Sequence, residues 1–185
     1  MTTHLSAELV ELDRAAFAGL QDQVLDVYAE AMQVRPDAAR SRRSILAAHV
    51  ERDGLRAVAA VRPDEPQRLV GIAYGYLGAP GQWWHDQVRA ALDEATAHRW
   101  LDDSFEVCEF HVRPASQGTG LGRALLARLL SLTDARTAVL TTPDLETRAR
   151  AFYRTAGWVD LLRELRFPGD PRAFAVLALP LVPTP

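Results

Sequence analysis

Three glycines and a glutamine, Gln117, Gly118, Gly120 and Gly122, form a segment poor in side chains, and an apolar run from 121 to 130 follows it. Glycine leaves the backbone N–H groups uncovered, and a helix that starts here adds the positive end of its dipole. Such a place holds a phosphate or a diphosphate. The first chemistry that the sequence predicts is therefore the binding of a phosphorylated ligand.

The spacing excludes two common phosphate loops. A dinucleotide fingerprint needs G-x-G-x-x-G, but Arg123 stands where its third glycine belongs. A P-loop needs a lysine that reaches the terminal phosphates, and all 21 basic residues of this chain are arginine. We therefore expect neither a dinucleotide site nor nucleotide hydrolysis.

What remains, Gln117-x-x-Gly120-x-Gly122 after an extended Val112-Arg113-Pro114, resembles the Q/R-x-x-G-x-G/A signature of the GNAT superfamily of N-acetyltransferases. The run 149–158, which holds Tyr153 and Gly157, looks like the A-x-x-x-Y-x-x-x-G-F/W element that ends the core of that family. The resemblance covers about 55–180, with the specific motifs at 105–158. It implies an α/β fold with a central mixed, mostly antiparallel sheet flanked by helices, which binds acyl-CoA.

The implied activity is transfer of the acetyl group of acetyl-CoA to a primary amine, by direct attack in a ternary complex. The alternative from a different class is a non-catalytic acyl-CoA-binding module used for sensing or assembly. The acceptor is then a small-molecule amine or a peptide amine, and a homodimer is left open. By resemblance, the cofactor-binding residues are Phe110, Val112, Gln117, Gly118, Thr119, Gly120, Leu121, Gly122, Arg123 and Tyr153.

The resemblance also assigns roles to single residues. N–H groups of the loop bind the diphosphate, the strand ending at Val112 pairs with the pantetheine, and a bulge near Phe110 turns an N–H toward the thioester carbonyl. Arg123 either adds charge or is a solvated helix residue. Tyr153 is the candidate proton donor, because a phenol with a pKa of about 10 is protonated at neutral pH. Glu146 replaces an asparagine common in the family, and we expect it to cap the helix.

Glu109 matches the position of a base in many family members. Strand alternation puts Glu106 on the opposite face and His111 on the same face as Glu109. Burial of Glu109 would raise its pKa toward the range useful in a base. His111, with an ordinary pKa near neutrality, is the alternative base, and a water chain is a third possibility.

An aromatic wall with a carboxylate suits a cationic amine. The residues that we predict for this pocket are Tyr28, Tyr74, Tyr76, Trp83, Trp84, His85 and His111. The alternative, core packing, stays open for Trp84 in particular.

The composition narrows the function further. A chain of 185 residues with net charge −3 and pI near 5.9 is one domain without a basic stripe for nucleic acid or membrane. The polar start and the lack of a long apolar run predict a cytoplasmic protein. The single Cys108 and five separated histidines have no metal-ligand spacing, so we expect no metal.

Helices and strands must position the candidate site residues, and the spacing of apolar residues along the chain predicts where these elements lie. We expect a helical part over 1–53, a sheet core over 54–180 with an insertion at 78–103, and a tail at 181–185. Helices are expected at 17–31, 37–50, 82–92, from 121 onward and at 149–156. Strands are expected at 55–61, 68–77, 105–112, 137–141, 158–167 and 173–179, with Pro63 and Pro66 outside the ladder.

Overall fold

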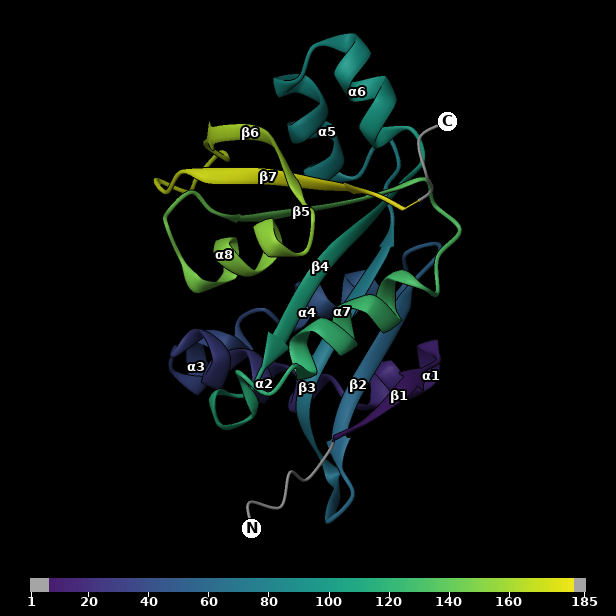
Figure 1. Cartoon of the computed structure of the whole chain (residues 1–185), viewed down its shortest axis with the longest axis vertical. Coiled ribbons are helices and arrows are strands. Elements are labelled where there is room, and N and C mark those ends of the chain that lie inside the picture. Colours follow the sequence, from purple (N-terminus) through teal and green to yellow (C-terminus); the bar gives the residue numbers. More distant parts are fainter. Residues whose placement is uncertain (1–6, 182–185) are drawn as a thin grey trace. The chain divides into compact units, whose positions relative to one another are not determined.

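The structure is a computed structural model that describes residues 7–181 (Figure 1). The polar start and the tail from residue 182 onward lie outside the described residues. The helices are α1 (Arg14–Gly19), α2 (Gln21–Met32), α3 (Pro36–Arg40), α4 (Arg43–Val50), α5 (Trp83–Ala91), α6 (Glu94–Leu101), α7 (Leu121–Leu130) and α8 (Arg148–Thr155). The strands are β1 (Glu8–Leu12), β2 (Arg56–Arg62), β3 (Glu65–Leu77), β4 (Ser104–Val112), β5 (Thr137–Pro143), β6 (Val159–Leu165) and β7 (Phe174–Pro180).

The strands form one mixed sheet in the order β1-β2-β3-β4-β5-β7-β6. β4 and β5 pair in parallel, and the pairs β1–β2, β2–β3, β5–β7 and β6–β7 are antiparallel. The predicted α/β class with a mostly antiparallel sheet and flanking helices is confirmed. The strands and helices expected between residues 55 and 180 are present, with boundaries that differ by a few residues.

The described chain packs as two compact units, residues up to 76 with 108–133, and 77–107 with 134 onward. The prediction of a single domain stays a prediction. β4 contributes to both units, since Cys108 begins the part that belongs to the first.

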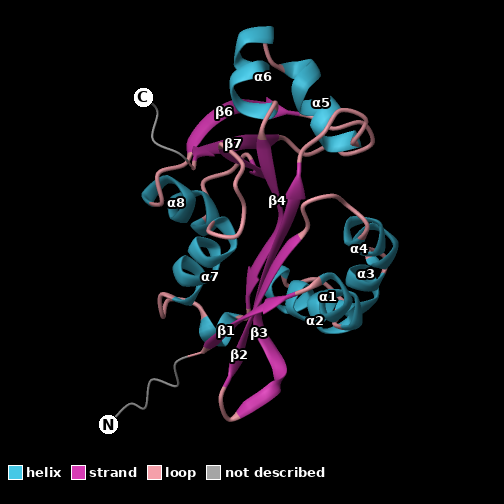
Figure 2. Ribbon diagram, turned by 90° about the vertical axis from the view of Figure 1, so that its right-hand side faces the viewer, coloured by secondary structure: helices cyan, strands magenta, loops and turns pink. Residues whose placement is uncertain are grey.

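In the first unit, helices cover both faces of the strands, with α7 on one side and α1 to α4 on the other (Figure 2). Alternate residues of β2 therefore face different helices, and both faces are buried. On the α7 side, the approach is close, because a Cβ on Gly71 would lie 3.2 Å from the Leu125 side chain. The core on the other side consists of Phe17, Val24, Leu25, Val27, Leu46, Val50, Ala57, Ala59, Val61, Leu69, Ile72 and Tyr74.

The N-terminal part differs from the helical region that we expected. β1 adds an edge strand, pairing Glu8 with Val61 through Leu12 with Ala57, and its five residues were too short a signal to find. Two helices replace the single one expected at 17–31. Asp13 caps α1 by accepting a hydrogen bond from the Ala16 N–H at 2.7 Å. The first helix ends before Leu20, and the second helix begins after it. The helix expected at 37–50 is likewise split into α3 and α4.

Pro66 lies within β3, so the predicted strand start was wrong. Its register explains how a proline is tolerated there. Arg62 pairs with Glu65 but Val61 pairs with Leu69, which leaves Pro66 opposite no residue. A residue without an N–H is accepted at such an irregularity because no ladder bond is lost.

The second unit packs α5 and α6 against β5, β6 and β7. Its core contains Val88, Ala97, Leu101, Val139, Phe167, Val176 and Ala178. Of the two helices in the segment 78–103, the sequence predicted only the first. Asp93 caps α6 by accepting a hydrogen bond from the Thr96 N–H at 2.9 Å, a signal that was present in the sequence.

Buried ion pairs fix α8 to its unit. The Arg150 guanidinium, 3% exposed, donates to both carboxylate oxygens of Asp160 at 2.9 and 3.1 Å and to the buried Asp144 at 3.3 Å. The helix begins after Thr147, whose hydroxyl accepts from the Arg150 N–H, so the prediction that Glu146 caps it was wrong. Glu146 instead pairs with Arg154 at the surface.

We predict that Arg150→Met lowers the free energy of unfolding by about 2–4 kcal/mol, because it leaves a buried carboxylate without one of its cations. Arg154→Met is the matched control on the same helix, since its partner is exposed, and it should leave the urea midpoint nearly unchanged. Urea titrations followed by tryptophan fluorescence measure both. Equal midpoints for the two variants would show that the buried pairs do not hold α8.

Candidate active site

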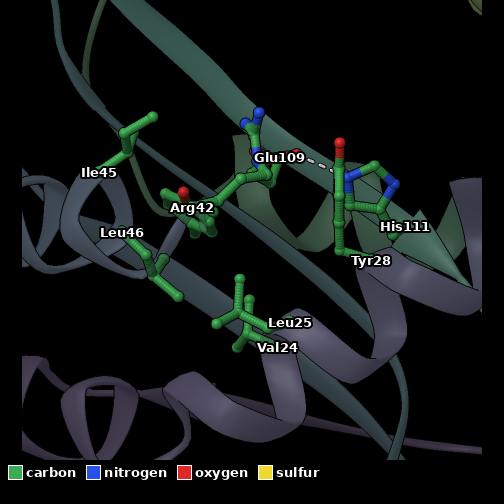
Figure 3. A pocket seen from close by; sticks show the side chains of 9 residues that line it. Val24, Leu25, Tyr28, Arg42, Ile45, Leu46, Glu109 and His111 are labelled. Carbon is green, nitrogen blue, oxygen red and sulfur yellow. Dashed lines mark hydrogen bonds and ion pairs between the residues drawn. The ribbon is translucent and has the colours of Figure 1, made fainter. Parts of the chain in front are cut away.

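A pocket opens in the first unit between α2, α4 and β4 (Figure 3). The pocket is small as it stands, with a cavity volume of about 10 Å³, the room of about one water molecule. Apolar side chains form most of the wall, and a small polar group lies on β4. The lining residues are Val24, Leu25, Tyr28, Arg42, Ile45, Leu46, Tyr74, Glu109 and His111.

Glu109 is the centre of the polar group. Its carboxylate accepts a hydrogen bond from His111 Nε2 at 2.6 Å through Oε2 and one from Arg42 Nη2 at 2.5 Å through Oε1. The side chains of Glu109 and His111 are only 14% and 12% exposed. The prediction that strand alternation puts them on one face is confirmed.

The predicted direction of the Glu109 pKa was wrong. Burial raises the pKa of Glu109, but three effects outweigh it: the hydrogen bond from His111, the positive charge that His111 carries at the acidic pH where Glu109 titrates, and the positive charge of Arg42. The pKa therefore lies below its ordinary value. With both partners in place, Glu109 stays ionised and is a weak base.

Arg42 is a site residue that the sequence analysis missed. It precedes α4, and 67 residues separate it from Glu109 in the chain. Its guanidinium lies 4.8 Å from the centre of the Tyr28 ring, against which His111 packs edge-on at 5.2 Å. The ionic and aromatic contacts together place Tyr28, Arg42, Glu109 and His111 in one cluster.

Tyr74 and Tyr76 extend this cluster through a second missed residue, His49. His49 Nδ1 lies 3.0 Å from the Tyr74 hydroxyl, and its ring lies 5.1 Å from that of Tyr76. Burial and the charge of Glu109 raise the pKa of Tyr74 well above its ordinary value. Burial lowers the pKa of His49; Glu109 opposes this shift, and Arg52 and Arg42 add to it. Tyr74 lines the pocket, whereas Tyr76 and His49 lie outside its lining.

The other three predicted pocket residues belong to the second unit. Trp84 Nε1 donates to Thr141 Oγ1 at 2.5 Å, which ties α5 to β5. His85 is buried beside Asp86, and the exposed Trp83 packs on Phe167 with ring centres 5.2 Å apart. Trp84 and His85 thus serve packing in their own unit, and a substrate role for the three stays a prediction.

The glycine-rich segment has the open backbone that its sequence indicated. Gly118 and Gly120 have φ values of 77° and 88°, and Gly120 directly precedes α7. Within residues 7–181, no backbone N–H of residues 118–122 donates to a backbone carbonyl. A Cβ added to Gly120 would meet no atom within 4 Å, so this side of the segment is open.

The C-terminal end of β4 lies beside the glycine-rich segment. A Cβ on Gly122 would approach the Phe110 ring to 3.3 Å and Val112 to 3.9 Å. Gln117 Nε2 donates to the Val112 carbonyl at 2.9 Å, and Thr119 Oγ1 donates to the Ser116 carbonyl. These contacts bring most of the predicted cofactor-binding positions into one patch of the first unit.

Arg113 holds the loop at its start. Its side chain, 8% exposed, donates through Nε to the Leu69 carbonyl at 2.6 Å and through Nη1 to Glu30. Its own N–H donates to the Val70 carbonyl. An arginine with this burial and these partners has a structural role, and it keeps the loop in register with β3.

Tyr153 lies on α8 in the second unit and is buried. Its ring packs edge-on against Phe152 at 5.5 Å and Trp158 at 5.6 Å. The glycine predicted to end the helix, Gly157, has a φ of 87°.

Two negative findings concern residues 7–181 alone. This part of the chain contains no group of three or more His, Cys, Asp or Glu side chains placed to hold a metal ion. None of its helices has the length and apolar character required to cross a membrane.

Comparisons with known proteins bear on the whole chain. A family model described as an acetyltransferase (GNAT) domain matches residues 82–160. A GCN5-like protein acetyltransferase of Mycobacterium tuberculosis is 35% identical over 202 aligned positions, which cover 94% of this chain and 98% of the relative. The chain belongs to the GNAT acetyltransferase family. It is therefore an acyltransferase whose family transfers acetyl groups from acetyl-CoA.

Solved structures agree on the GNAT fold. An aminoglycoside 6'-acetyltransferase type Ii has a TM-score of 0.67 at 18% identity, covering 96% of this chain and 99% of its own. The Salmonella typhimurium protein yncA, solved with its cofactor acetyl-CoA, has a TM-score of 0.63 at 15% identity, covering 97% and 96%. At such identities the likeness shows the fold, and the predicted GNAT-type fold is confirmed.

We predict that Arg42→Met raises the pKa of Glu109, because a positive charge that favours the carboxylate is removed while burial remains. A ¹³C carboxyl titration by NMR measures the shift. Arg43→Met is the control of equal charge change, since the Arg43 side chain pairs with Asp22 at the surface. A Glu109 pKa that moves by the same amount in both variants would contradict a specific Arg42 effect.

Proposed function

We propose that this GNAT enzyme transfers the acetyl group of acetyl-CoA to a primary amine held beside Glu109 and His111, by direct attack in a ternary complex. The observation that carries the proposal is the buried carboxylate–imidazole pair on β4, which faces a pocket in the same unit as the open glycine loop. The carboxylate–imidazole pair suits the amine, and the glycine loop suits acetyl-CoA.

The loop fits acetyl-CoA because, within residues 7–181, the N–H groups of residues 118–122 have no backbone partner, and because the surface at Gly120 is open. The dipole of α7 adds positive charge at the same place. When bound, acetyl-CoA supplies an acetyl group activated as a thioester. The residues of the first unit that would hold it are Phe110, Val112, Gln117, Gly118, Thr119, Gly120, Leu121, Gly122 and Arg123.

His111 is the proton acceptor in this proposal, in place of Glu109 itself. An ionised carboxylate only accepts hydrogen bonds, so Nε2 of His111 carries the proton that bonds to Glu109. Nδ1 then presents a lone pair and has no hydrogen-bond partner among residues 7–181. It takes a proton from the ammonium, either directly or through water, and Glu109 stabilises the imidazolium that forms.

Tyr153 is the proposed proton donor to the departing thiolate of coenzyme A. Its position in the family motif supports this role, as does the fact that a phenol carries its proton at neutral pH. The rings of Phe152 and Trp158 fix the orientation of its side chain.

The acceptor is a small-molecule or peptide amine, and the name of the mycobacterial relative, a protein acetyltransferase, favours an amine on a protein. The acidic balance of the chain favours an enzyme that acts without nucleic acid or membrane.

We predict that Gly120→Val weakens acetyl-CoA binding more than about tenfold, because a branched side chain covers the N–H groups and strains a left-handed residue. Isothermal titration calorimetry measures the affinity. Gly169→Val is the matched control, since Gly169 also has a positive φ, 83°, and open space around its Cα, but lies outside the loop. Unchanged affinity in a folded Gly120→Val protein would remove the loop from the donor site.

His111→Gln should lower turnover about 10²-fold or more, because glutamine keeps a donor for Glu109 but lacks the Nδ1 lone pair. The loss should be greatest at low pH and should shrink as the pH rises, since the amine then deprotonates without help. The assay follows thiol release from acetyl-CoA. A loss of equal size at every pH would assign His111 a structural role.

Tyr153→Phe should lower turnover roughly 10²-fold while acetyl-CoA affinity and melting temperature stay close to wild type, because only the acidic proton is removed. The same thiol assay and a thermal melt test this. Near-normal turnover on a verified acceptor would exclude Tyr153 as the proton donor.

A further inference from the structure

The guanidinium of Arg42 lies in a site suited to any cation. The Tyr28 ring provides an aromatic face at 4.8 Å, and Glu109 provides a carboxylate oxygen at 2.5 Å. Aromatic faces and carboxylates bind an ammonium by the same forces. The apolar wall at Leu25, Ile45 and Leu46 suits the methylene chain that leads to such a group.

The fold depends little on Arg42. Its one side-chain hydrogen bond among residues 7–181 goes to Glu109, its side chain is 37% exposed, and its backbone lies between α3 and α4. Arg113 and Arg150 have side chains 8% and 3% exposed and two or more partners each. Arg42 can therefore turn into solvent at a lower cost than Arg113 or Arg150 can.

Charge balance makes Arg42 and an ammonium alternatives. With Arg42 in place, the single negative charge of Glu109 already has a cation, and both carboxylate oxygens have a donor. A second cation beside it would be repelled in a site that is largely shielded from water. An ammonium that reaches His111 thus binds best when the guanidinium has left.

We propose that Arg42 occupies the position of the acceptor's ammonium group and must be displaced by it, so that Arg42 sets the affinity for the acceptor. The inference rests on the proposed function. The acceptor class is a primary ammonium at the end of an aliphatic chain, without a carboxylate close to the amine. Its apparent affinity is the intrinsic affinity reduced by the fraction of molecules in which Arg42 is displaced.

The test measures the binding of n-butylammonium to the full chain without acetyl-CoA, by NMR titration of the His111 imidazole signals. Arg42→Ala should bind this probe about tenfold more tightly than wild type, as expected if about one molecule in ten has the arginine displaced. Arg43→Ala, the neighbouring change of equal charge, should leave the affinity unchanged. Methylguanidinium should compete with n-butylammonium in Arg42→Ala, and adding Glu109→Gln should abolish the gain.

Unchanged or weaker n-butylammonium binding by Arg42→Ala overturns the proposal, as does an equal gain in Arg43→Ala. Selective loss of 6-aminohexanoate binding in Arg42→Ala also overturns it, because Arg42 would then anchor a carboxylate. Arg42→Gln, which keeps a polar side chain, repeats the test, and circular dichroism verifies the fold of each variant. The binding test contains no acetyl donor, so the proposed function is tested separately, by thiol release from acetyl-CoA with n-butylammonium as the acceptor. A binding gain in the first test with no thiol release in the second would refute the proposed function and leave this inference standing.

Discussion

A carboxylate removed from water needs hydrogen-bond donors, and Glu109 has two, one from its own strand and one from a distant part of the chain. His111 is fixed beside it on the same strand, whereas Arg42 reaches it from the start of α4. Burial alone would protonate the carboxylate, and the two partners together keep it ionised. This balance decides the chemistry of the pocket, because an ionised Glu109 orients His111 and attracts a cation.

β4 connects this pocket with the donor site. Residues 109 and 111 face the pocket, Phe110 and Val112 contact the glycine segment, and Arg113 fixes the turn that follows. Successive side chains of a strand point to opposite faces, which separates the two sets. One strand thus carries the carboxylate–imidazole pair on one face and part of the proposed acetyl-CoA site on the other. The helix dipole of α7 adds positive charge to the second of these.

The local signals in the sequence were sufficient for β4, the loop, α7 and α8, because glycine spacing and strand alternation act over a few residues. They did not reveal Arg42, which meets Glu109 through the packing of α4, 67 residues away in the chain. The pKa of Glu109 was predicted in the wrong direction for the same reason: burial could be inferred from the strand, but the arginine could not. The sequence left Trp84 open between a pocket and a core, with the core the more usual place for a tryptophan on an apolar helix face, and its bond to Thr141 on β5 favours packing.

The central claim is that Glu109 holds the proton of His111 on Nε2 and leaves Nδ1 ready to accept one. Long-range ¹H–¹⁵N NMR of the imidazole rings, in the free enzyme at neutral pH, reads this directly, with His111→Gln to assign the signals. The account predicts a neutral His111 with Nε2 protonated and Nδ1 bare. A proton on Nδ1 with a bare Nε2, or a doubly protonated ring, would contradict it.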